Sequence, residues 1–276
     1  MMEHYMKQML VTALDRSLPI FVETMGWNER QDEFNRPQGY HCYHWLQTTG
    51  GEGQFEISDK IVTLAPNQGI LLQPNASHSY VAQSNPWSTW YITFNGNLAP
   101  FIVSSLGLAT STVISWEPGS RLSTLHTRSE NLARQSFDFN GMDGSAFVYR
   151  FLMDLKRYGQ VDNQRSFSQH TERLMPFIRF LEENYSNPAF GLTQLVEYAG
   201  ISSQRLNYLF RMTTGMSPYQ YLIHLRIQKS KEYLINDKKL TVKAIASLVG
   251  FLDSSHFVYT FRKIESKTPQ TFRDLN

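Results

Sequence analysis

The sequence predicts an α+β protein whose N-terminal part forms a β-barrel or jelly roll and whose C-terminal part is all helical. Three observations lead to this prediction. Short β-favouring runs separated by Gly, Pro and Asn clusters dominate the first hundred residues. Apolar residues at helical spacing begin after Pro118. A repeat whose equivalent positions lie 50 or 51 residues apart fills the C-terminal third.

Composition favours a folded protein of two domains. The chain has 276 residues, of which 41% are hydrophobic and 13% aromatic, so it can bury a sizeable core. Cys42 is the single cysteine, which excludes an intramolecular disulfide and a cysteine-based zinc cluster. The first 14 residues lack the apolar core of a signal peptide, and no stretch reaches the roughly 18 apolar residues of a membrane span. We expect a cytoplasmic protein without a membrane partner.

The strands are expected in order along the N-terminal part. The aromatic-rich run 40–47 comes first and is broken by a glycine cluster. The run 57–64 follows, then 70–72 after an Asn-Gln-Gly turn. A last pair of strands surrounds Pro86 and ends in the run 90–94. This spacing is typical of a barrel or jelly roll.

Two helices are expected next, over 121–135 and 145–158. The second helix is amphipathic and either packs on its own barrel or forms a seam with a second copy. The polar stretch 160–171 is expected to be a linker. These features predict a domain at 1–159, the linker, and a second domain at 172–276.

Charge is divided unequally between the two parts. Residues 173–276 hold 14 Lys and Arg against 8 Asp and Glu, a net charge of +6. Residues 1–172 hold 12 against 16, a net charge of −4. The basic part indicates an anionic partner or a solvated helix surface.

The repeat predicts two helix-turn-helix units. In each copy a short helix ends at a glycine, Gly200 or Gly250, and Ser202 or Asp253 caps a second helix. Arg, Gln and Asn can bind base edges, and Ser and Tyr can bind phosphates, so the exposed face of each second helix suits DNA. A purely structural helical bundle is the alternative. The predicted contacts are Ser203, Gln204, Arg205, Asn207, Tyr208 and Arg211 in copy one, and Ser254, Ser255, His256, Tyr259 and Arg262 in copy two.

A long helix is expected between the two copies. Ser217 caps it, Pro218 occupies its first turn, and it continues to about Leu234. At 1.5 Å per residue, roughly 18 residues span about 27 Å. A rod of this length could place two reading helices in successive major grooves, about 34 Å apart.

The C-terminal pattern resembles the AraC-type transcription regulators over about residues 172–276. The residues that match are Ser217-Pro218, Tyr221-Leu222, Arg226-Ile227, Ile245-Ala246-Ser247-Leu248-Val249-Gly250-Phe251, Asp253-Ser254-Ser255-His256-Phe257, Phe261-Arg262-Lys263, Thr268-Pro269 and Phe272-Arg273. The resemblance implies two helix-turn-helix units that read one face of double-stranded promoter DNA. Ser266 departs from the family, which usually has glycine there, and this could strain or reshape the last turn.

The N-terminal part is similar to the cupin-type sensor domain of the same family over roughly residues 18–115. The matching segments are Arg36-Pro37-Gln38-Gly39-Tyr40, Gly51-Glu52-Gly53, 74–80 and 87–96. The resemblance implies a small-molecule effector, with a carbohydrate as the leading candidate, and a homodimer formed through the helices that follow. Alternation along the strands and the resemblance together give the candidate ligand residues Arg36, Tyr43, Trp45, Gln47, His78, Tyr80 and Tyr91. Tyr80 and Tyr91 align best with the pocket positions of sugar-sensing relatives.

These observations predict a DNA-binding transcription regulator, expected to be an activator, controlled by a small molecule. Contact with RNA polymerase is a further partner that the resemblance allows. His41 and His44 are three positions apart on a strand and so face opposite ways, and no phosphate loop or serine nucleophile elbow occurs. We therefore expect no catalytic residue, metal or cofactor. The alternatives are a metal-dependent cupin enzyme with a DNA-binding tail and a DNA-binding regulator without a ligand.

Overall fold

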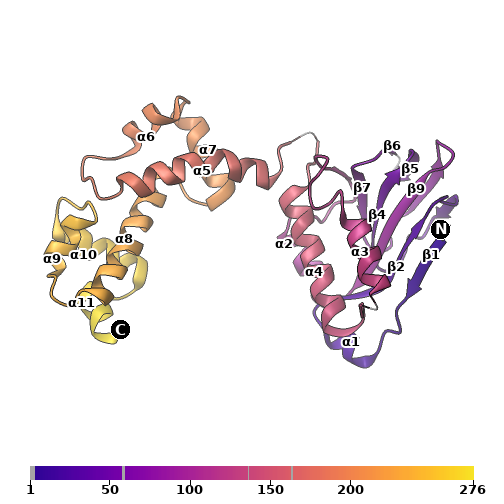
Figure 1. Ribbon diagram of the computed structural model, residues 1–276, viewed down its shortest axis with the longest axis horizontal. Helices are drawn as coiled ribbons and strands as arrows, with labels where there is room; N and C mark the ends of the chain where they lie inside the picture. Colours follow the sequence, from indigo (N-terminus) through magenta and orange to yellow (C-terminus); the bar gives the residue numbers. More distant parts are fainter. Residues whose placement is uncertain (1–3, 58–59, 136, 163) are drawn as a thin grey trace. The chain divides into compact units, whose positions relative to one another are not determined.

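The chain folds into two compact units, which the computed structural model of Figure 1 shows. Residues 1–168 make up the first unit, called here the sheet domain, and residues 169–276 make up the second, the helical domain. The structure describes residues 4–57, 60–135, 137–162 and 164–276. The two domains are described separately.

In the described part of the sheet domain, ten strands form two antiparallel sheets. The strands are β1 (His4–Gln8), β2 (Phe21–Asn28), β3 (Phe34–Arg36), β4 (Tyr43–Gly50), β5 (Gly53–Ile57), β6 (Lys60–Leu64), β7 (Gln68–Leu72), β8 (His78–Ala82), β9 (Ser88–Asn95) and β10 (Val113–Ser115). The larger sheet has the order β1-β2-β9-β4-β7-β10 and the smaller sheet has the order β3-β8-β5-β6. The β-rich N-terminal part is therefore as expected, with more strands than the sequence runs had indicated.

The larger sheet is covered by helix on one face. The helices of this domain are α1 (Ala13–Ser17), α2 (Ala99–Ser105), α3 (Leu125–Arg134) and α4 (Gly141–Tyr158). The ring of Phe151 on α4 lies with its centroid 5.6 Å from that of Trp45 on β4 and 6.3 Å from that of Trp90 on β9. All three side chains are at most 1% exposed. Helix α4 therefore packs on this face of its own sheet (Figure 1).

The opposite face of the larger sheet meets the smaller sheet. Leu46 and Ile70 from the larger sheet pack with Phe55 and Tyr80 from the smaller one. Because side chains alternate along a strand, every second residue of β4 and β9 enters this second core. The larger sheet thus buries both of its faces, and apolar and aromatic residues therefore occupy both the odd-numbered and the even-numbered positions along its strands.

All of the regular secondary structure in the described residues of the helical domain is helical. They are α5 (Phe167–Asn184, which begins just before the domain), α6 (Leu192–Ala199), α7 (Ser203–Thr214), α8 (Pro218–Asn236), α9 (Val242–Leu248), α10 (Ser254–Glu265) and α11 (Pro269–Leu275). Helices α6 and α7 form the first helix-turn-helix and α9 and α10 the second, as the repeat predicts. The expected bridging helix is α8, whose 19 residues span about 28 Å. Among the described residues, no helix is both long and apolar enough to cross a membrane.

Buried Arg226 on α8 ties the two halves of the helical domain together. Its Nε donates a hydrogen bond to the carbonyl oxygen of Tyr185 at 2.8 Å, and its Nη2 donates to those of Asn187 at 2.9 Å and Phe190 at 3.3 Å. Its guanidinium also lies 6.0 Å from the ring centroid of Phe251, which belongs to the second core. The Arg226 side chain thereby joins the segment 185–190, which precedes the first helix-turn-helix, to the second helix-turn-helix.

Several element boundaries differ from the sequence expectations, including that of the first expected helix, which begins at Leu125 and not at residue 121. Ile57 ends β5 and Lys60 begins β6, so the expected strand 57–64 is two strands, and residues 58–59 lie outside the described residues. Helix α4 begins four residues before the expected position 145. Helix α5 starts at Phe167, inside the expected linker 160–171; the polar residues 168–171 of its first turns are half-buried, so polar composition there did not mark a linker. Residue 163 of that linker also lies outside the described residues.

Candidate functional site

A cavity of about 420 Å³ lies between the two sheets. It is lined from several strands and from the loops that follow β2 and β3. The lining residues are Met6, Gln8, Thr24, Asn28, Gln31, Asp32, Phe34, Arg36, Tyr40, His44, Leu46, Tyr80, Tyr91 and Thr93. Its volume is within the range of small-molecule sites. It also combines aromatic rings with a few polar groups, as such sites commonly do.

Arg36 supplies the positive charge of the cavity. Its guanidinium carbon lies 5.0 Å from the ring centroid of Phe34 and 4.9 Å from that of Tyr40. Two aromatic rings within about 6 Å attract a cation and restrict where its side chain can lie. The five N–H donors of Arg36 are therefore held at the wall of the cavity.

Two histidines near this wall are uncharged. Burial, with the positive charge of Arg36 and the neighbouring His78 ring adding to it, lowers the pKa of His44 to about 3. Burial also lowers the pKa of His78, whose Nδ1 donates a hydrogen bond to the carbonyl oxygen of Ala76 at 2.7 Å. The other ring nitrogen of His78, Nε2, is consequently a hydrogen-bond acceptor. Both imidazoles stay neutral at physiological pH.

Two tyrosines of the cavity are also neutral. Burial raises the pKa of Tyr80 and that of Tyr91 to about 12. The ring of Tyr80 stacks on that of Phe55, with centroids 4.7 Å apart, which fixes its orientation. Each phenol can both donate and accept a hydrogen bond.

Some buried polar atoms next to the cavity have no protein partner among the described residues. Nδ2 of Asn28 donates to Oε1 of Gln31 at 2.7 Å, while Oδ1 of Asn28 is unpaired. Nδ1 of His44 is unpaired as well. An unpaired buried polar atom costs about 1–3 kcal/mol, so these atoms favour a ligand or water that hydrogen-bonds to them. The cavity can therefore bind a neutral, hydrogen-bonding molecule.

The structure divides the seven candidate ligand residues into three groups. Arg36, Tyr80 and Tyr91 line the cavity. His78 lies behind the wall, with its ring centroid 6.2 Å from that of His44. The remaining three, Tyr43, Trp45 and Gln47, lie on the opposite face of β4.

Tyr43, Trp45 and Gln47 are therefore corrected from ligand contacts to core residues. The ring of Tyr43 stacks on that of Phe94, and Nε1 of Trp45 donates to Oε1 of Gln47 at 3.1 Å. The predicted alternation is present, but alternation does not identify which face of a strand is covered by a helix. Aromatic residues lie on both faces here because both faces are buried.

Sequence reasoning also missed several residues of the cavity. His44 is one of them. It lies on the same face of β4 as Leu46, toward the smaller sheet, and its spacing from His41 along the chain does not indicate this. Tyr40 and Gln31 lie in loops, where periodicity gives no signal. Tyr40 could have been found from its place in the segment 36–40, which resembles the sensor domain.

A separate polar group lies outside this cavity. In the described part of the chain, Glu23, His41 and Cys42 form the one group of three potential metal ligands, with ligand atoms within 4.8 Å of one another. Nε2 of His41 lies 2.9 Å from Oε2 of Glu23, which pairs the carboxylate with a histidine. Burial raises the pKa of the Cys42 thiol, which keeps it protonated, whereas a metal requires the thiolate.

The second helix of each helix-turn-helix presents the predicted polar face. Gly200 has φ of 61° and Gly250 has φ of 85°, the left-handed conformation expected at each turn. Oγ of Ser202 accepts a hydrogen bond from the amide of Arg205 at 3.3 Å, and the Asp253 carboxylate accepts two from the start of α10. The expected caps are confirmed.

The reading faces are exposed and equivalent in the two copies. On α7 the exposed members of the predicted set are Gln204, Arg205, Tyr208 and Arg211, and on α10 they are Ser255, His256, Tyr259 and Arg262. Ser203, Asn207 and Ser254 are half-buried, and Nδ2 of Asn207 donates to the carbonyl oxygen of Ser203 at 3.0 Å. The ring of Tyr208 lies 6.1 Å from that of His170 on α5 and stays 55% exposed. Each helix thus offers one tyrosine and one arginine at matching positions.

Comparison with known proteins matches both domains. Residues 22–143 match the AraC-like ligand binding domain and residues 195–274 match a helix-turn-helix domain. A relative from Pediococcus pentosaceus, the raffinose operon transcriptional regulatory protein RafR, is 24% identical over 87% of this chain and 86% of its own length. The Msm operon regulatory protein of Streptococcus mutans is 24% identical over 81% of each chain.

A third relative matches only the C-terminal part. The transcriptional activator RhaR of Cronobacter sakazakii is 36% identical over 30% of this chain and 29% of its own length. Among solved structures, the C-terminal domain of the response regulator yesN from Fusobacterium nucleatum is 30% identical, covers 37% of this chain and 98% of its own, and has a TM-score of 0.35. With its ligand-binding domain and its two helix-turn-helix units, the chain belongs to the AraC family of DNA-binding transcription regulators.

Proposed function

We propose that this regulator responds to a carbohydrate bound in the cavity between the two sheets, and that these sheets close as a jelly roll around it. The observation that carries the proposal is the chemistry of the cavity wall. Neutral phenols, a neutral imidazole and amide side chains, with one arginine held between rings and the carboxylate of Asp32, match a ligand that has hydroxyl groups and an apolar ring face.

The most extensive of the matches described above supports the same ligand class. The regulator from Pediococcus controls a raffinose operon, and it aligns with 87% of this chain. An effector of this kind changes promoter occupancy only if it binds the two states of the regulator with different affinities.

Isothermal titration of the full chain with raffinose and with its component monosaccharides tests the proposal. We expect one of these sugars to bind, and Tyr91→Phe to weaken it about tenfold by removing a phenol at the wall. Tyr43→Phe is the matched control, because Tyr43 lies on the opposite face of the larger sheet. No binding by any sugar, or equal loss in both variants, contradicts the carbohydrate proposal.

We propose that α7 and α10 are the DNA-reading helices and that α8 sets their separation. Support comes from the length of α8, about 28 Å, which approaches one turn of DNA, and from the exposed Arg and Tyr at matching positions. The half-buried Asn207 has one amide hydrogen already bonded, so we assign it a smaller share of the contacts.

We propose that α4 also forms a homodimer contact. Met142, Tyr149 and Met153 are 43–71% exposed and lie 7 and 4 residues apart, a spacing that places them along one helix face. Tyr149→Glu is expected to shift the protein toward monomer in sedimentation velocity. Phe101→Glu, on the exposed part of α2, is the control that should leave the oligomeric state unchanged.

We propose that the protein acts by binding alone, as a cytoplasmic activator that contacts RNA polymerase at its promoter. The named activity of the Cronobacter relative, a transcriptional activator, supports this direction of control. Transcription in vitro from the promoter of its own gene tests the proposal. A fall in transcript on adding the protein and its sugar would identify a repressor instead.

A further inference from the structure

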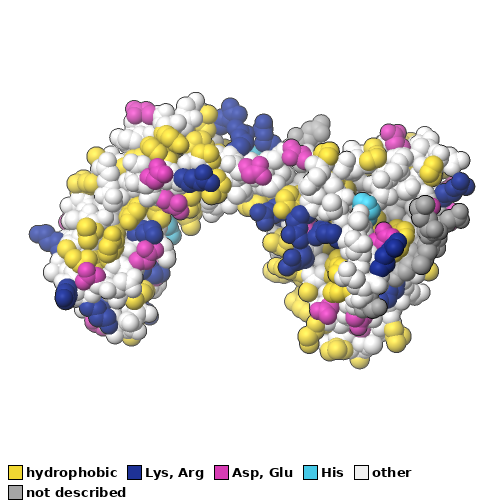
Figure 2. Space-filling view, in the orientation of Figure 1, with side chains coloured by type: hydrophobic (Ala, Val, Ile, Leu, Met, Phe, Trp, Pro, Cys, Tyr) yellow, Lys and Arg dark blue, Asp and Glu magenta, His cyan; other side chains and the backbone are white. Residues whose placement is uncertain are grey.

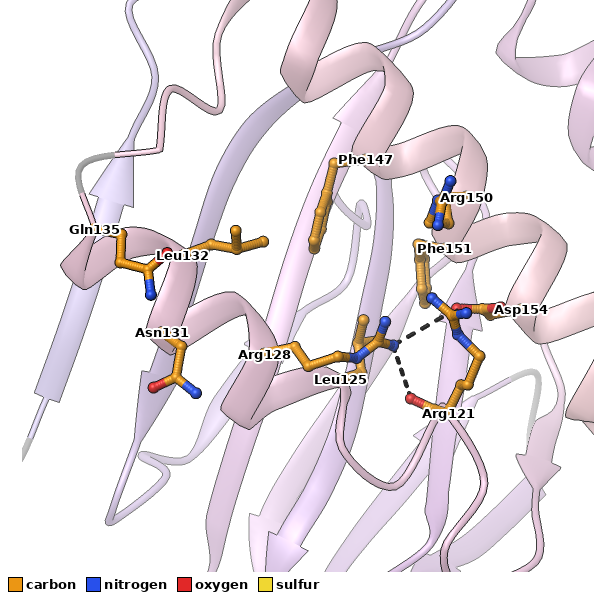
Figure 3. Close-up of a pocket in the computed structure, with 10 residues that line it drawn as sticks. All are labelled: Arg121, Leu125, Arg128, Asn131, Leu132, Gln135, Phe147, Arg150, Phe151 and Asp154. Atoms are coloured by element: carbon orange, nitrogen blue, oxygen red, sulfur yellow. Dashed lines mark hydrogen bonds and ion pairs between the residues drawn. The ribbon is translucent and has the colours of Figure 1, made fainter.

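A second cavity, of about 410 Å³, lies between α3 and α4 on the sheet domain. None of its lining residues lines the cavity between the sheets. Its lining residues are Arg121, Leu125, Arg128, Asn131, Leu132, Gln135, Phe147, Arg150, Phe151 and Asp154. Figure 3 shows the side chains of α3 and those of α4 facing each other across it. We propose that this cavity binds a small amphipathic anion, a carboxylate attached to an apolar body.

The charge of the wall is the first observation behind this proposal. Arg121, Arg128 and Arg150 bring three positive charges, and Asp154 brings the one negative charge of the lining. Figure 2 shows Lys and Arg side chains gathered over α4 on this domain, whose net charge is otherwise negative. The local excess of two positive charges is complementary to an anion.

Asp154 does not use up the donors of these arginines. Its Oδ2 lies 3.4 Å from Nε of Arg121 and 3.6 Å from Nη2 of Arg128, whereas paired Arg–carboxylate hydrogen bonds measure about 2.7–2.9 Å. Nη2 of Arg128 also donates to the carbonyl oxygen of Arg121 at 2.9 Å, and the dashed lines of Figure 3 mark this hydrogen bond and the longer contact with Asp154. These contacts leave guanidinium hydrogens for a ligand.

Two further arginine groups have no partner in the described part of the chain. Nε of Arg128 is buried and makes no hydrogen bond. Arg150 is exposed, and no ion pair joins it to any described residue. A buried donor without an acceptor is costly, so an oxyanion at this position would stabilise the wall.

The floor of the cavity determines the rest of the ligand. Leu125, Leu132, Phe147 and Phe151 are apolar, and Phe147 and Leu132 are only half-buried where they face the opening. Covering such surface stabilises a complex by about 25 cal/mol for each Å² removed from water. A bare inorganic anion would leave this surface uncovered, so a carboxylate with an apolar body fits best.

Titration of the full chain with benzoate tests the site, with benzamide as its neutral counterpart and inorganic phosphate as its purely polar one. We expect benzoate to bind more tightly than either, and added NaCl to weaken it. Arg128→Gln should weaken benzoate about tenfold. Arg134→Gln is the matched control, because Arg134 lies on the same helix outside the cavity and pairs with Glu130.

Asp154→Asn separates a binding role from a structural one. Asp154 competes with the ligand for two arginines, so its neutral variant should bind benzoate more tightly, which a merely destabilised cavity would not do. The proposal would be overturned if benzoate did not bind, or if benzamide or phosphate bound as tightly as benzoate. It would also be overturned if Arg128→Gln and Arg134→Gln weakened benzoate binding equally, or if Asp154→Asn bound benzoate more weakly than wild type. The proposal would also be overturned if Arg128→Gln changed only the dissociation of the homodimer, because a second copy of the chain would then occupy the cavity.

Discussion

Replacing Arg226 by methionine should destabilise the helical domain strongly. The guanidinium satisfies three carbonyl oxygens, those of Tyr185, Asn187 and Phe190, and the side chain is 6% exposed. Methionine keeps the apolar volume but donates nothing. The carbonyl oxygen of Asn187 also accepts from the amide of Phe190 at 3.1 Å, so two carbonyl oxygens would lose their donor. At about 1 kcal/mol or more each, the loss is about 2 kcal/mol.

Differential scanning calorimetry of the full chain measures this loss. For a domain of about 100 residues, 1 kcal/mol corresponds to roughly 4 °C, so the transition of the helical domain should fall by about 8 °C. The transition of the sheet domain is the internal reference, because Arg226 belongs to the other domain.

Lys229→Met is the matched control on the same helix. Lys229 forms an (i, i+3) ion pair with Glu232 at 3.1 Å near the surface, and such pairs contribute at most about 1 kcal/mol. If Arg226→Met shifts the transition no more than Lys229→Met does, water replaces the guanidinium at the three carbonyls. The reasoning that Arg226 joins the two halves of the helical domain would then be refuted.

Three further predictions concern DNA reading, a helix end and an acid-sensitive contact. Arg205→Ala should weaken DNA binding by roughly 1–3 kcal/mol and relax the base preference, which fluorescence anisotropy on the promoter of its own gene measures. Arg179→Ala, at an exposed position of α5, is the control. Unchanged affinity and base preference in Arg205→Ala would remove Arg205 from the set of predicted DNA contacts. Ser266→Gly should raise the thermal midpoint by relieving about 1 kcal/mol of strain, because Ser266 has φ of 58°, and a lower midpoint would contradict this. Asp15→Asn should destabilise the protein at pH 7 by about 1 kcal/mol, since hydrogen bonds to the Asp15 carboxylate from Thr12 and Gly141 lower its pKa. The stabilisation by the Asp15 carboxylate is complete above the ordinary aspartate pKa of about 3.9, and it is lost as pH falls through the lower pKa of Asp15 in the folded state. If the difference in free energy of unfolding between wild type and Asp15→Asn stays constant down to pH 2, this explanation is excluded.

The helical domain was largely determined by its sequence, because its signals are local. A left-handed glycine, a capping residue and an apolar pair each act within one or two helical turns. Gly200, Gly250, Ser202 and Asp253 therefore specify where α7 and α10 begin, and the exposed faces of those helices follow from the 3.6-residue period. Arg226 was visible only as part of the family pattern, since its three carbonyl partners lie 36–41 residues away.

The sheet domain was determined only in outline. Alternation in β4 correctly places Tyr43, Trp45 and Gln47 on one side of the strand, but a strand covered on both sides is aromatic at both parities. Which side meets helix α4 and which meets the second sheet depends on contacts between residues far apart in the chain. Trp45 against Phe151 is such a contact, 106 residues apart.

By itself the sequence determined the two-part organisation, the paired helix-turn-helix units and the exposed polar faces of their second helices. Only the tertiary structure decided which residues line the cavity between the sheets, bringing His44 and Tyr40 to Arg36 and removing Trp45 to the core. It alone also revealed the arginine-lined cavity between α3 and α4, because Arg121, Arg128 and Arg150 form no pattern along the chain. The physical reason is that helix signals lie within a few neighbouring residues, whereas a cavity is formed by distant segments that the fold brings together.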